Sequence, residues 1–414
     1  SKAFGELVES ERHTPSLAAE EVQALLDSQA DVVVLDARRF DEYQTMSIPT
    51  GISVPGAELV LRARELAPDP ATRIIVNCAG RTRSIIGTQS LINSGIANPV
   101  SALRNGTIGW TLAGQKLAHG QARRFAPTRE EHRQIAARDA RRVADKARVG
   151  RATLADLQRW QQEPKRTTYL FDVRTPEEFE AGHLPGARST PGGQLVQETD
   201  HVASVRGARL VLADDDGVRA NMSASWLAQL GWEVYVLDDL QAANFSEQGA
   251  WVAPVPAPLQ AELISPHTLA EWLPHGDTAV LDFTPSVNYV KRHIPGAFWA
   301  LRAQLANALA KVPPAERYVL TCGTSQLARL AVAEVEAITG KPVFLLQGGT
   351  LNWIAEKLPL EEGETHLASP RIDRYRRPYE GTDSPKEAMQ AYLDWEFGLV
   401  DQLARDGTHG FYVI

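Results

Sequence analysis

The sequence predicts an α/β protein of three tandem domains, each built on a parallel sheet with helices on both faces. Two repeated features carry this prediction. Short apolar runs occur three times and end at Asp36, Asp172 and Asp282. A second apolar run follows each of them at a nearly constant distance and leads into Cys78, Asp214 and Cys322. Helical patterns separate the runs, and strands that alternate with helices form parallel sheets covered on both faces.

Each element of the repeat has the composition expected of its structure. The run before Asp36 is Val32-Val-Val-Leu35, and continuous β-branched runs are typical of strands buried on both faces. A turn with proline follows in each copy, at Pro49, Pro185 and Pro295. The first copy continues with a helical pattern over residues 85–94, and Gly95 predicts the C-cap of that helix.

The repeats divide the chain into three domains and three further segments. The domains are expected at residues 1–122, 151–252 and 263–362. A stretch rich in Arg, Glu and Ala predicts an exposed helical connector at 123–150, and three prolines predict a stiff linker at 253–262. Residues 363–414 form no fourth copy, and their aromatic and leucine side chains predict a helix that docks on the body of the protein.

Composition excludes several classes of protein. The 414 residues carry a formal net charge of -8, which argues against a general nucleic-acid binder. The apolar runs are too short to cross a membrane, and no signal-peptide pattern opens the chain. Two cysteines are too few for a disulfide framework or a structural zinc site. We therefore expect a cytoplasmic protein without a metal, a membrane contact or a nucleic-acid partner.

The loop after the second strand of copy one has the composition of an anion site around a nucleophile. It reads Cys78-Ala79-Gly80-Arg81-Thr82-Arg83-Ser84 and lies between a predicted strand and a helix start. Parallel sheets place ligand sites at the carboxyl ends of strands, and the amides of a helix N-terminus favour negative charge. Cys78 is therefore the predicted nucleophile, because such surroundings favour the reactive thiolate. The alternative is an inert buried cysteine beside surface arginines.

Further motifs recur around these features. Copy one has Asp36-Ala-Arg38, the Ile48-Pro49 turn and Asn105-Gly106-Thr-Ile-Gly-Trp110. Copy two has Asp172-Val-Arg174, His183-Leu-Pro185-Gly186 and Trp226-Leu-Ala-Gln-Leu-Gly231. Copy three has Asp282, His293-Ile-Pro295-Gly296, Cys322 and Gly348-Gly349-Thr-Leu-Asn-Trp353. In this order, the motifs resemble the successive signatures of rhodanese domains, and the three copies cover most of the chain.

The resemblance implies a sulfurtransferase that needs no cofactor. The Cys78 thiolate would attack the outer sulfur of an anionic donor such as thiosulfate or a persulfide, and would carry that sulfur as a persulfide. A thiol or cyanide, or a protein partner, would then accept it. The resemblance assigns Arg81 and Arg83 to the donor, and the loop amides to the persulfide; those amides belong to Ala79, Gly80, Thr82 and Ser84. Asp36 and Arg38 are expected to form a structural pair near the site.

The three copies are not chemically equivalent. Copy two has Asp214 at the nucleophile position, and a carboxylate cannot become a persulfide, so this copy is expected to be inactive. Copy three retains Cys322, but the loop that follows has no arginine until Arg329. Cys322 is therefore a second candidate site with a weaker expected preference for anions.

Two other functions fit parts of the sequence. A cysteine phosphatase or arsenate reductase also uses a thiolate in an anion loop, with an arginine six residues after the cysteine. Ser84 and Ala328 occupy that position here, so the loop length favours sulfur transfer. A sulfur carrier or persulfide-binding scaffold would suit copies two and three, whereas the complete loop of copy one favours an enzyme.

Overall fold

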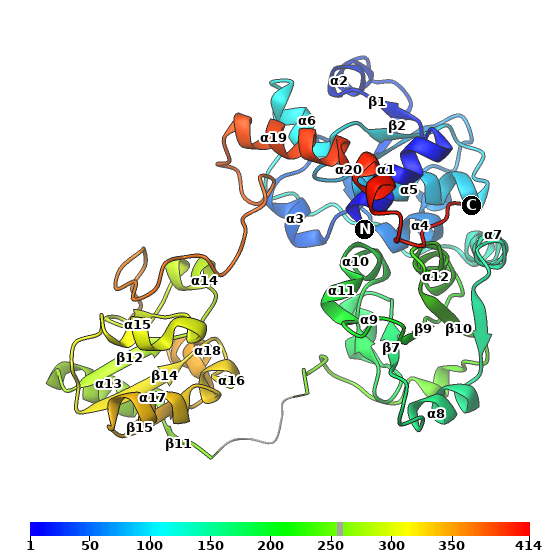
Figure 1. Cartoon of the computed structure of the whole chain (residues 1–414). Helices are drawn as coiled ribbons and strands as arrows, with labels where there is room; N and C mark the ends of the chain where they lie inside the picture. Colours follow the sequence, from blue (N-terminus) through cyan, green and yellow to red (C-terminus); the bar gives the residue numbers. More distant parts are fainter. Residues whose placement is uncertain (255–259) are drawn as a thin grey trace. The chain divides into compact units, whose positions relative to one another are not determined.

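The computed structural model describes residues 1–254 and 260–414. The predicted linker at 253–262 therefore lies partly outside the described residues. The chain forms two compact units, which we describe separately (Figure 1). The first contains Ser1–Trp251 together with Arg377–Ile414, and the second contains Val252–Arg376. In the described residues, no helix has both the length and the apolar character that a membrane span requires.

Copy one is a five-stranded parallel sheet with the order β1-β5-β4-β2-β3. The strands are β1 (Ser16–Leu17), β2 (Val32–Asp36), β3 (Ile52–Ser53), β4 (Arg73–Asn77) and β5 (Val100–Leu103). The helices are α1 (Lys2–Arg12), α2 (Ala19–Asp27), α3 (Phe40–Thr45), α4 (Leu59–Leu66), α5 (Thr82–Ser94) and α6 (Gly106–Leu112). Gly95 ends α5 in the left-handed conformation, as the sequence predicts.

Copy two repeats this sheet with the order β6-β10-β9-β7-β8. Its strands are β6 (Gly150–Ala152), β7 (Thr168–Asp172), β8 (Arg188–Ser189), β9 (Arg209–Ala213) and β10 (Glu233–Leu237). Its helices are α8 (Leu154–Gln161), α9 (Pro176–Ala181), α10 (Gly192–Gln197), α11 (Thr199–Val202) and α12 (Arg219–Gln229). After β10, a short 3-10 helix (Ala242–Asn244) takes the place that the α-helix α6 has after β5.

Copy three forms most of the second unit, with the strand order β11-β15-β14-β12-β13. The strands are β11 (Glu262–Ile264), β12 (Thr278–Asp282), β13 (Phe298–Trp299), β14 (Arg317–Thr321) and β15 (Val343–Leu346). The helices are α13 (Pro266–Trp272), α14 (Ser286–Lys291), α15 (Leu305–Leu309), α16 (Gln326–Arg329), α17 (Val332–Thr339) and α18 (Gly349–Ala355). All the strand pairs in the three sheets are parallel, so the predicted fold class is confirmed.

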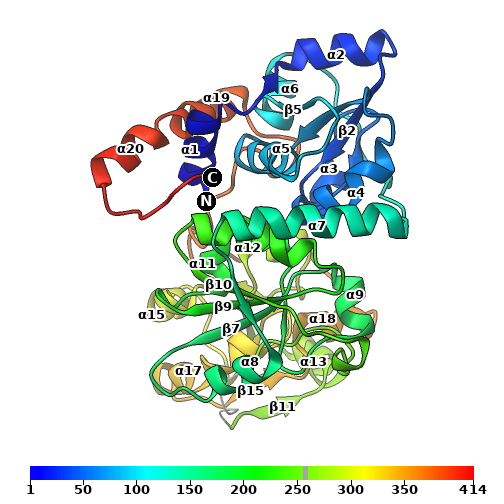
Figure 2. The same cartoon turned by 90° about the vertical axis from the view of Figure 1, so that its right-hand side faces the viewer.

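The connector between copies one and two contains helix α7 (Glu130–Lys146). The sequence predicts that this helix is exposed, but its alanine side is buried at Ala136, Ala140 and Ala144. It packs on α4 and on α12, and Figure 2 shows it lying between the two sheets of the first unit. Small alanines allow this close approach, while the charged residues face solvent.

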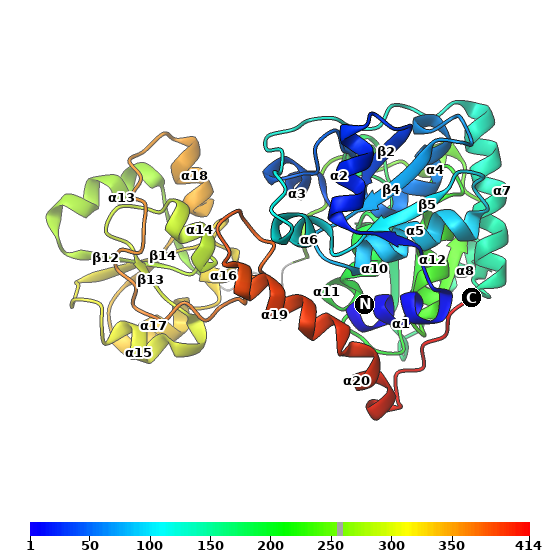
Figure 3. The ribbon, with the colours of Figure 1, turned by 90° about the horizontal axis from the view of Figure 1, so that it is seen from above.

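The end of the chain returns to the first unit as α19 (Lys386–Phe397) and α20 (Leu399–Asp406). These helices lie beside α1, and α19 also packs on α6 (Figure 3). Met389, Tyr392 and Leu393 form an apolar cluster with Ile108 of α6. Helix α19 thus lies next to the loop that carries Cys78.

Candidate active site

Cys78 directly follows β4, and the loop after it turns into α5. The register pairs Asp36 with Asn77, so the carboxyl ends of β2 and β4 lie side by side. The Cys78 side chain is buried, and its Sγ lies 3.3 Å from the hydroxyl of Ser84. That hydroxyl donates a hydrogen bond to the Arg81 carbonyl at 2.8 Å. The loop thus curls around the sulfur, as expected of a strand-to-helix turn.

The start of α6 holds the Cys78 loop from the other side. Thr107 donates its N–H to the Cys78 carbonyl at 2.9 Å, and Ile108 donates to the Ala79 carbonyl at 3.0 Å. Gly106 has φ of 54°, and a Cβ there would lie 2.2 Å from the Cys78 carbonyl oxygen. A side chain is therefore excluded at this position both by the space and by the backbone conformation.

Arg81 points to α1 and is surrounded by partners. Its Nε and Nη2 each lie 2.8 Å from a carboxylate oxygen of Glu6, and Nη2 also pairs with Glu9. The Phe397 ring of α19 covers the guanidinium at 4.3 Å. Burial by itself would lower the pKa of Arg81, but Glu6, together with Glu9 and Glu396, raises it. A donor anion would therefore meet an arginine that already has two carboxylate partners.

Arg83 points to α3 and forms a bidentate pair with Glu42, with N–O distances of 2.7 and 2.8 Å. Burial would raise the pKa of Glu42, but Arg83, together with Arg38 and Arg39, lowers it to about 2. Burial would lower the pKa of Arg83, but the charge and the hydrogen bonds of Glu42 act in the opposite direction, and the pKa is raised overall. An ionised Cys78 contributes to the same rise, so the charges of Arg83 and Cys78 act on each other.

Asp36 and Arg38 form a buried ion pair at 2.8 Å. Asn77 also donates to the Asp36 carboxylate at 2.8 Å, which links the pair to the residue before Cys78. Copy two contains the same pair, Arg174 with Asp172, at 2.7 Å. Because the pair persists in a copy without the thiol, its geometry suits a structural role at the sheet edge.

Several residues around the loop have no role in the sequence-based prediction of the site. The set comprises Glu6, Glu9, Glu42, Tyr392 and Glu396. A Cβ on Gly80 would lie 3.1 Å from Glu396 Oε2 and 3.4 Å from Tyr392, so α19 lies directly on the loop. Only Glu42 has a signal in the sequence, because Glu178 stands at the same distance after Arg174 in copy two. The others come from helices at the two chain ends, which no local pattern connects to Cys78.

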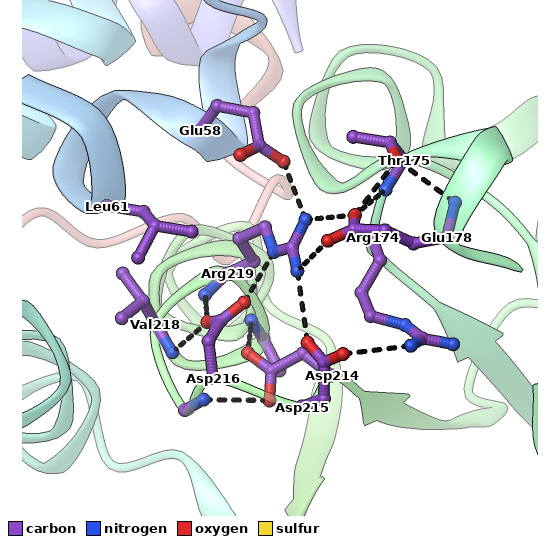
Figure 4. A network of polar contacts seen from close by, with 12 residues as sticks. Glu58, Leu61, Arg174, Thr175, Glu178, Asp214, Asp215, Asp216, Val218 and Arg219 are labelled. Carbon is purple, nitrogen blue, oxygen red and sulfur yellow. Dashed lines mark hydrogen bonds and ion pairs between the residues drawn. The ribbon is translucent and has the colours of Figure 1, made fainter. Parts of the chain in front are cut away.

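In copy two, the Asp214 carboxylate fills its own amide loop (Figure 4). It accepts hydrogen bonds from Gly217 N–H at 3.2 Å and from Ala220 N–H at 2.8 Å. Burial, followed by the neighbouring Asp216, raises the pKa of Asp214 well above its ordinary value. The space that an anion would use is thus taken by a side chain of the protein itself.

Copy two also has an open cleft of 560 Å³ beside this loop. Asp214, Asp215, Arg174, Leu240 and Phe245 are among the lining residues. In copies one and three, a glycine-initiated helix packs on the loop instead, at Gly106 and Gly349. The cleft therefore results from the loss of that helix, and its acidic floor does not favour an anionic donor.

In copy three, Cys322 is buried in an apolar cluster with Leu320 and Ala328. Gly349 repeats the contact made by Gly106, since its Cβ would lie 2.3 Å from the Cys322 carbonyl oxygen. The positions of Arg81 and Arg83 are Ser325 and Leu327 here. The Ser325 hydroxyl donates to the Leu346 carbonyl at 2.6 Å, and Leu327 is exposed.

Arg329, the first arginine after Cys322, lies at the other end of the strands from the Cys322 loop. It lines a cleft with Glu262 and Glu336 beside the start of β15, whereas the Cys322 loop follows the end of β14. Because β14 and β15 are parallel, the start of one and the end of the other lie at opposite ends of the sheet. Within the described residues, no group of three or more His, Cys, Asp or Glu side chains is arranged to hold a metal ion.

Comparisons with known proteins identify the family to which the chain is similar. The family model for the rhodanese-like domain matches residues 18–113, 153–239 and 265–356. A solved structure of thiosulfate sulfurtransferase from Pseudomonas aeruginosa is 75% identical, with a TM-score of 0.98. That match covers 100% of this chain and 79% of the other.

A curated relative, the uncharacterized protein YqhL of Bacillus subtilis (strain 168), is 37% identical over 73 residues. This match covers 17% of the present chain and 56% of the relative, so it spans about half the relative's length. The predictions of the family and of a sulfurtransferase function are confirmed by the family model and the P. aeruginosa structure. The chain belongs to the rhodanese family, with three rhodanese-like domains in sequence.

Proposed function

We propose that this sulfurtransferase moves sulfane sulfur from thiosulfate or a related donor to a thiophilic acceptor through a persulfide on Cys78. One contrast among the copies supports this assignment most directly. Copy one alone combines a cysteine after its second strand with arginines inside the following loop. Copy two has lost the thiol, and copy three has lost both arginines.

The first half-reaction forms the persulfide. The Cys78 thiolate attacks the outer sulfur of thiosulfate, a new S–S bond forms, and the old S–S bond breaks. Sulfite leaves with the electron pair of the broken bond. Ser84 lies 3.3 Å from the sulfur, and its hydroxyl can rotate to donate a hydrogen bond to the thiolate. The positive charge of Arg83 stabilises the same thiolate, and the backbone amides of residues 79–84 lie around the transferred sulfur.

The second half-reaction returns the enzyme to its starting state. Cyanide or a thiolate attacks the outer sulfur of the persulfide and takes it up as thiocyanate or as a new persulfide. The Cys78 thiolate leaves with the bonding electrons. The covalent intermediate predicts ping-pong kinetics, with sulfite released before the acceptor reacts.

We further propose that the donor is a small anion and that the protein works in a reducing compartment such as the cytoplasm. Cys78 and Cys322 are both free and buried, and they belong to different units. Both features suit thiols that do not pair with each other. The acceptor is cyanide, a small thiol or a thiol of a partner protein, and each of them would attack the same outer sulfur of the Cys78 persulfide.

The test is thiosulfate:cyanide sulfurtransferase activity in wild type, Cys78→Ser and Cys322→Ser, combined with intact-protein mass spectrometry after thiosulfate treatment. We expect the wild type and Cys322→Ser to turn over and to gain the mass of one sulfur atom. Cys78→Ser should do neither. Equal activity in Cys78→Ser would refute the assignment. An adduct on Cys78 without turnover would instead identify a sulfur carrier.

A further inference from the structure

Arg83 has a structural counterpart in copy two. Arg219 is the fifth residue after Asp214, as Arg83 is the fifth after Cys78. Each arginine pairs with a glutamate of the helix that follows the first long strand of its domain. Arg83 binds Glu42 at 2.7 Å, and Arg219 binds Glu178 at 2.5 Å. This shared pair therefore does not by itself distinguish the copy with a thiol from the copy without one.

The other partners of the two arginines differ greatly. Arg219 also forms ion pairs with Asp215, Asp216 and Glu58, at 3.1, 2.6 and 2.9 Å (Figure 4). Among the described residues, Arg83 forms an ion pair with one carboxylate only, that of Glu42. The loop accounts for two of the missing partners, because Ala79 and Gly80 stand at the positions of Asp215 and Asp216.

The third partner that Arg219 has and Arg83 lacks is Glu58, which reaches Arg219 across the contact between copies one and two. Glu58 ends the segment Pro55-Gly-Ala-Glu58, and the equivalent segment of copy two is Pro191-Gly-Gly-Gln194. Both segments begin alike, since Gly56 donates to the Ala37 carbonyl at 3.1 Å and Gly192 to the Val173 carbonyl at 3.0 Å. A Cβ on Gly193 would lie 3.0 Å from the Gly56 nitrogen, so the two segments pack directly against each other.

The contact between the two copies is approximately reciprocal, because equivalent segments of the two copies pack against each other. Glu58 of copy one reaches Arg219 of copy two, and the reciprocal position for Arg83 is Gln194. Arg83 and Gln194 both line a cleft of 270 Å³ between the two copies. The Gln194 amide donates to Glu198, so the neutral side chain is already engaged along its own helix.

We infer that Gln194 is a positioning residue for the Cys78 reaction, because its neutral side chain leaves the charge of Arg83 available. This inference rests on the proposed function. A carboxylate at position 194 would reproduce the pair of Glu58 with Arg219 and neutralise Arg83 from the second side. Arg83 would then stabilise the Cys78 thiolate and an anionic donor less well. Copy two therefore has a neutral side chain at position 194, whereas copy one has Glu58 at the equivalent position and pairs it with Arg219.

The experiment uses charge changes of both signs at this position in the full chain. Gln194→Glu should raise the KM for thiosulfate at least about fivefold, because a charge-assisted contact with the donor is weakened. It should also slow iodoacetamide alkylation of Cys78, measured in a Cys322→Ser background, because less thiolate is present. Gln194→Lys should change both quantities in the opposite direction. A matched control is Gln161→Glu, which adds the same charge to an exposed position of copy two.

The sign of the two effects separates charge from structure. A loosened interface would impair both Gln194 variants in the same direction, and that result would overturn the inference. Unchanged KM and alkylation rate in a folded Gln194→Glu protein would overturn it too. Gln194→Lys keeps the test decisive if the glutamate variant fails to fold. Failure of the proposed function looks different, because wild type would then lack turnover, or Cys78→Ser would retain it.

Discussion

Arg81 of the Cys78 loop and Glu6 of the first helix form a bidentate ion pair in which both side chains are only 5% exposed. The pair fastens the loop to a helix that begins at the second residue of the chain. Breaking a buried pair is costly because the remaining charge stays buried. Copy two has Gly217 at the position of Arg81, so this attachment belongs to copy one.

Glu6→Ala is therefore expected to destabilise the first unit. We expect a loss of about 2 kcal/mol, below the usual cost for a broken buried pair because Glu9 remains as a second partner for Arg81. The measurement is urea unfolding followed by tryptophan fluorescence. Glu11→Ala, at an exposed position of the same helix, is the control and should have little effect. Equal stability of the two variants would contradict a role for the pair.

The Glu42–Arg83 pair predicts a pH dependence of stability. The pKa of Glu42 is lowered from 4.5 to about 2 in the folded state, so folding favours the ionised form. Its contribution is fully present above the unfolded pKa and is lost as the pH falls through about 2. The stability difference between wild type and Glu42→Gln should therefore shrink between about pH 5 and pH 2. A difference that stays constant over this range would contradict the assignment.

Gly106 and Gly349 offer a matched pair of substitutions in the two copies with a cysteine. Each has a positive φ, and a Cβ on either would approach a cysteine carbonyl oxygen to 2.2 or 2.3 Å. Gly106→Ala should distort the Cys78 loop and reduce kcat at least about tenfold, since small displacements of catalytic groups are costly. Gly349→Ala should lower the melting temperature of the second unit but leave thiosulfate turnover intact. Equal losses of activity would indicate that Cys322 also contributes.

Placing a cysteine in copy two should not create a second active site. In Cys78→Ser/Asp214→Cys, the new thiol would face Asp215 and Asp216, and Arg219 is already paired with four carboxylates. Such surroundings disfavour a thiolate and repel an anionic donor. The rate of persulfide formation from thiosulfate, followed by mass spectrometry, should remain at the background of Cys78→Ser. Rapid formation would show that the thiol alone limits copy two.

Helix α19 covers the Cys78 loop, so the loss of its packing is expected to loosen that loop. Tyr392 is buried between Ile108 and Gly80, and burial is the first cause of its raised pKa. Tyr392→Ala removes this packing and should speed hydrogen exchange in residues 78–84, because the cover over the loop is lost. Gln390→Ala changes an exposed residue of the same helix and serves as the control. Unchanged exchange in the loop would contradict its dependence on α19.

Local patterns were sufficient for the strands and for the three copies, whereas Cys78 as the nucleophile stays a prediction. The runs that end at Asp36, Asp172 and Asp282 are continuous and apolar, and each forms an interior strand of its sheet, with a strand on both sides. The charged composition of residues 123–150 predicts an exposed helical connector, but the alanine side of helix α7 is buried. Alanine is compatible with either environment, so only the packing partners on α4 and α12 decide which face is covered.

The sequence by itself determined three α/β copies, their family, and the difference between Cys78, Asp214 and Cys322, because strand periodicity and loop composition are local properties. The tertiary structure decided the surroundings of the loop arginines. Arg81 meets Glu6 and Phe397 from opposite ends of the chain, and Arg219 meets Glu58 from another domain. Electrostatic partners are selected by distance in space, and that distance is set by how whole helices and domains pack.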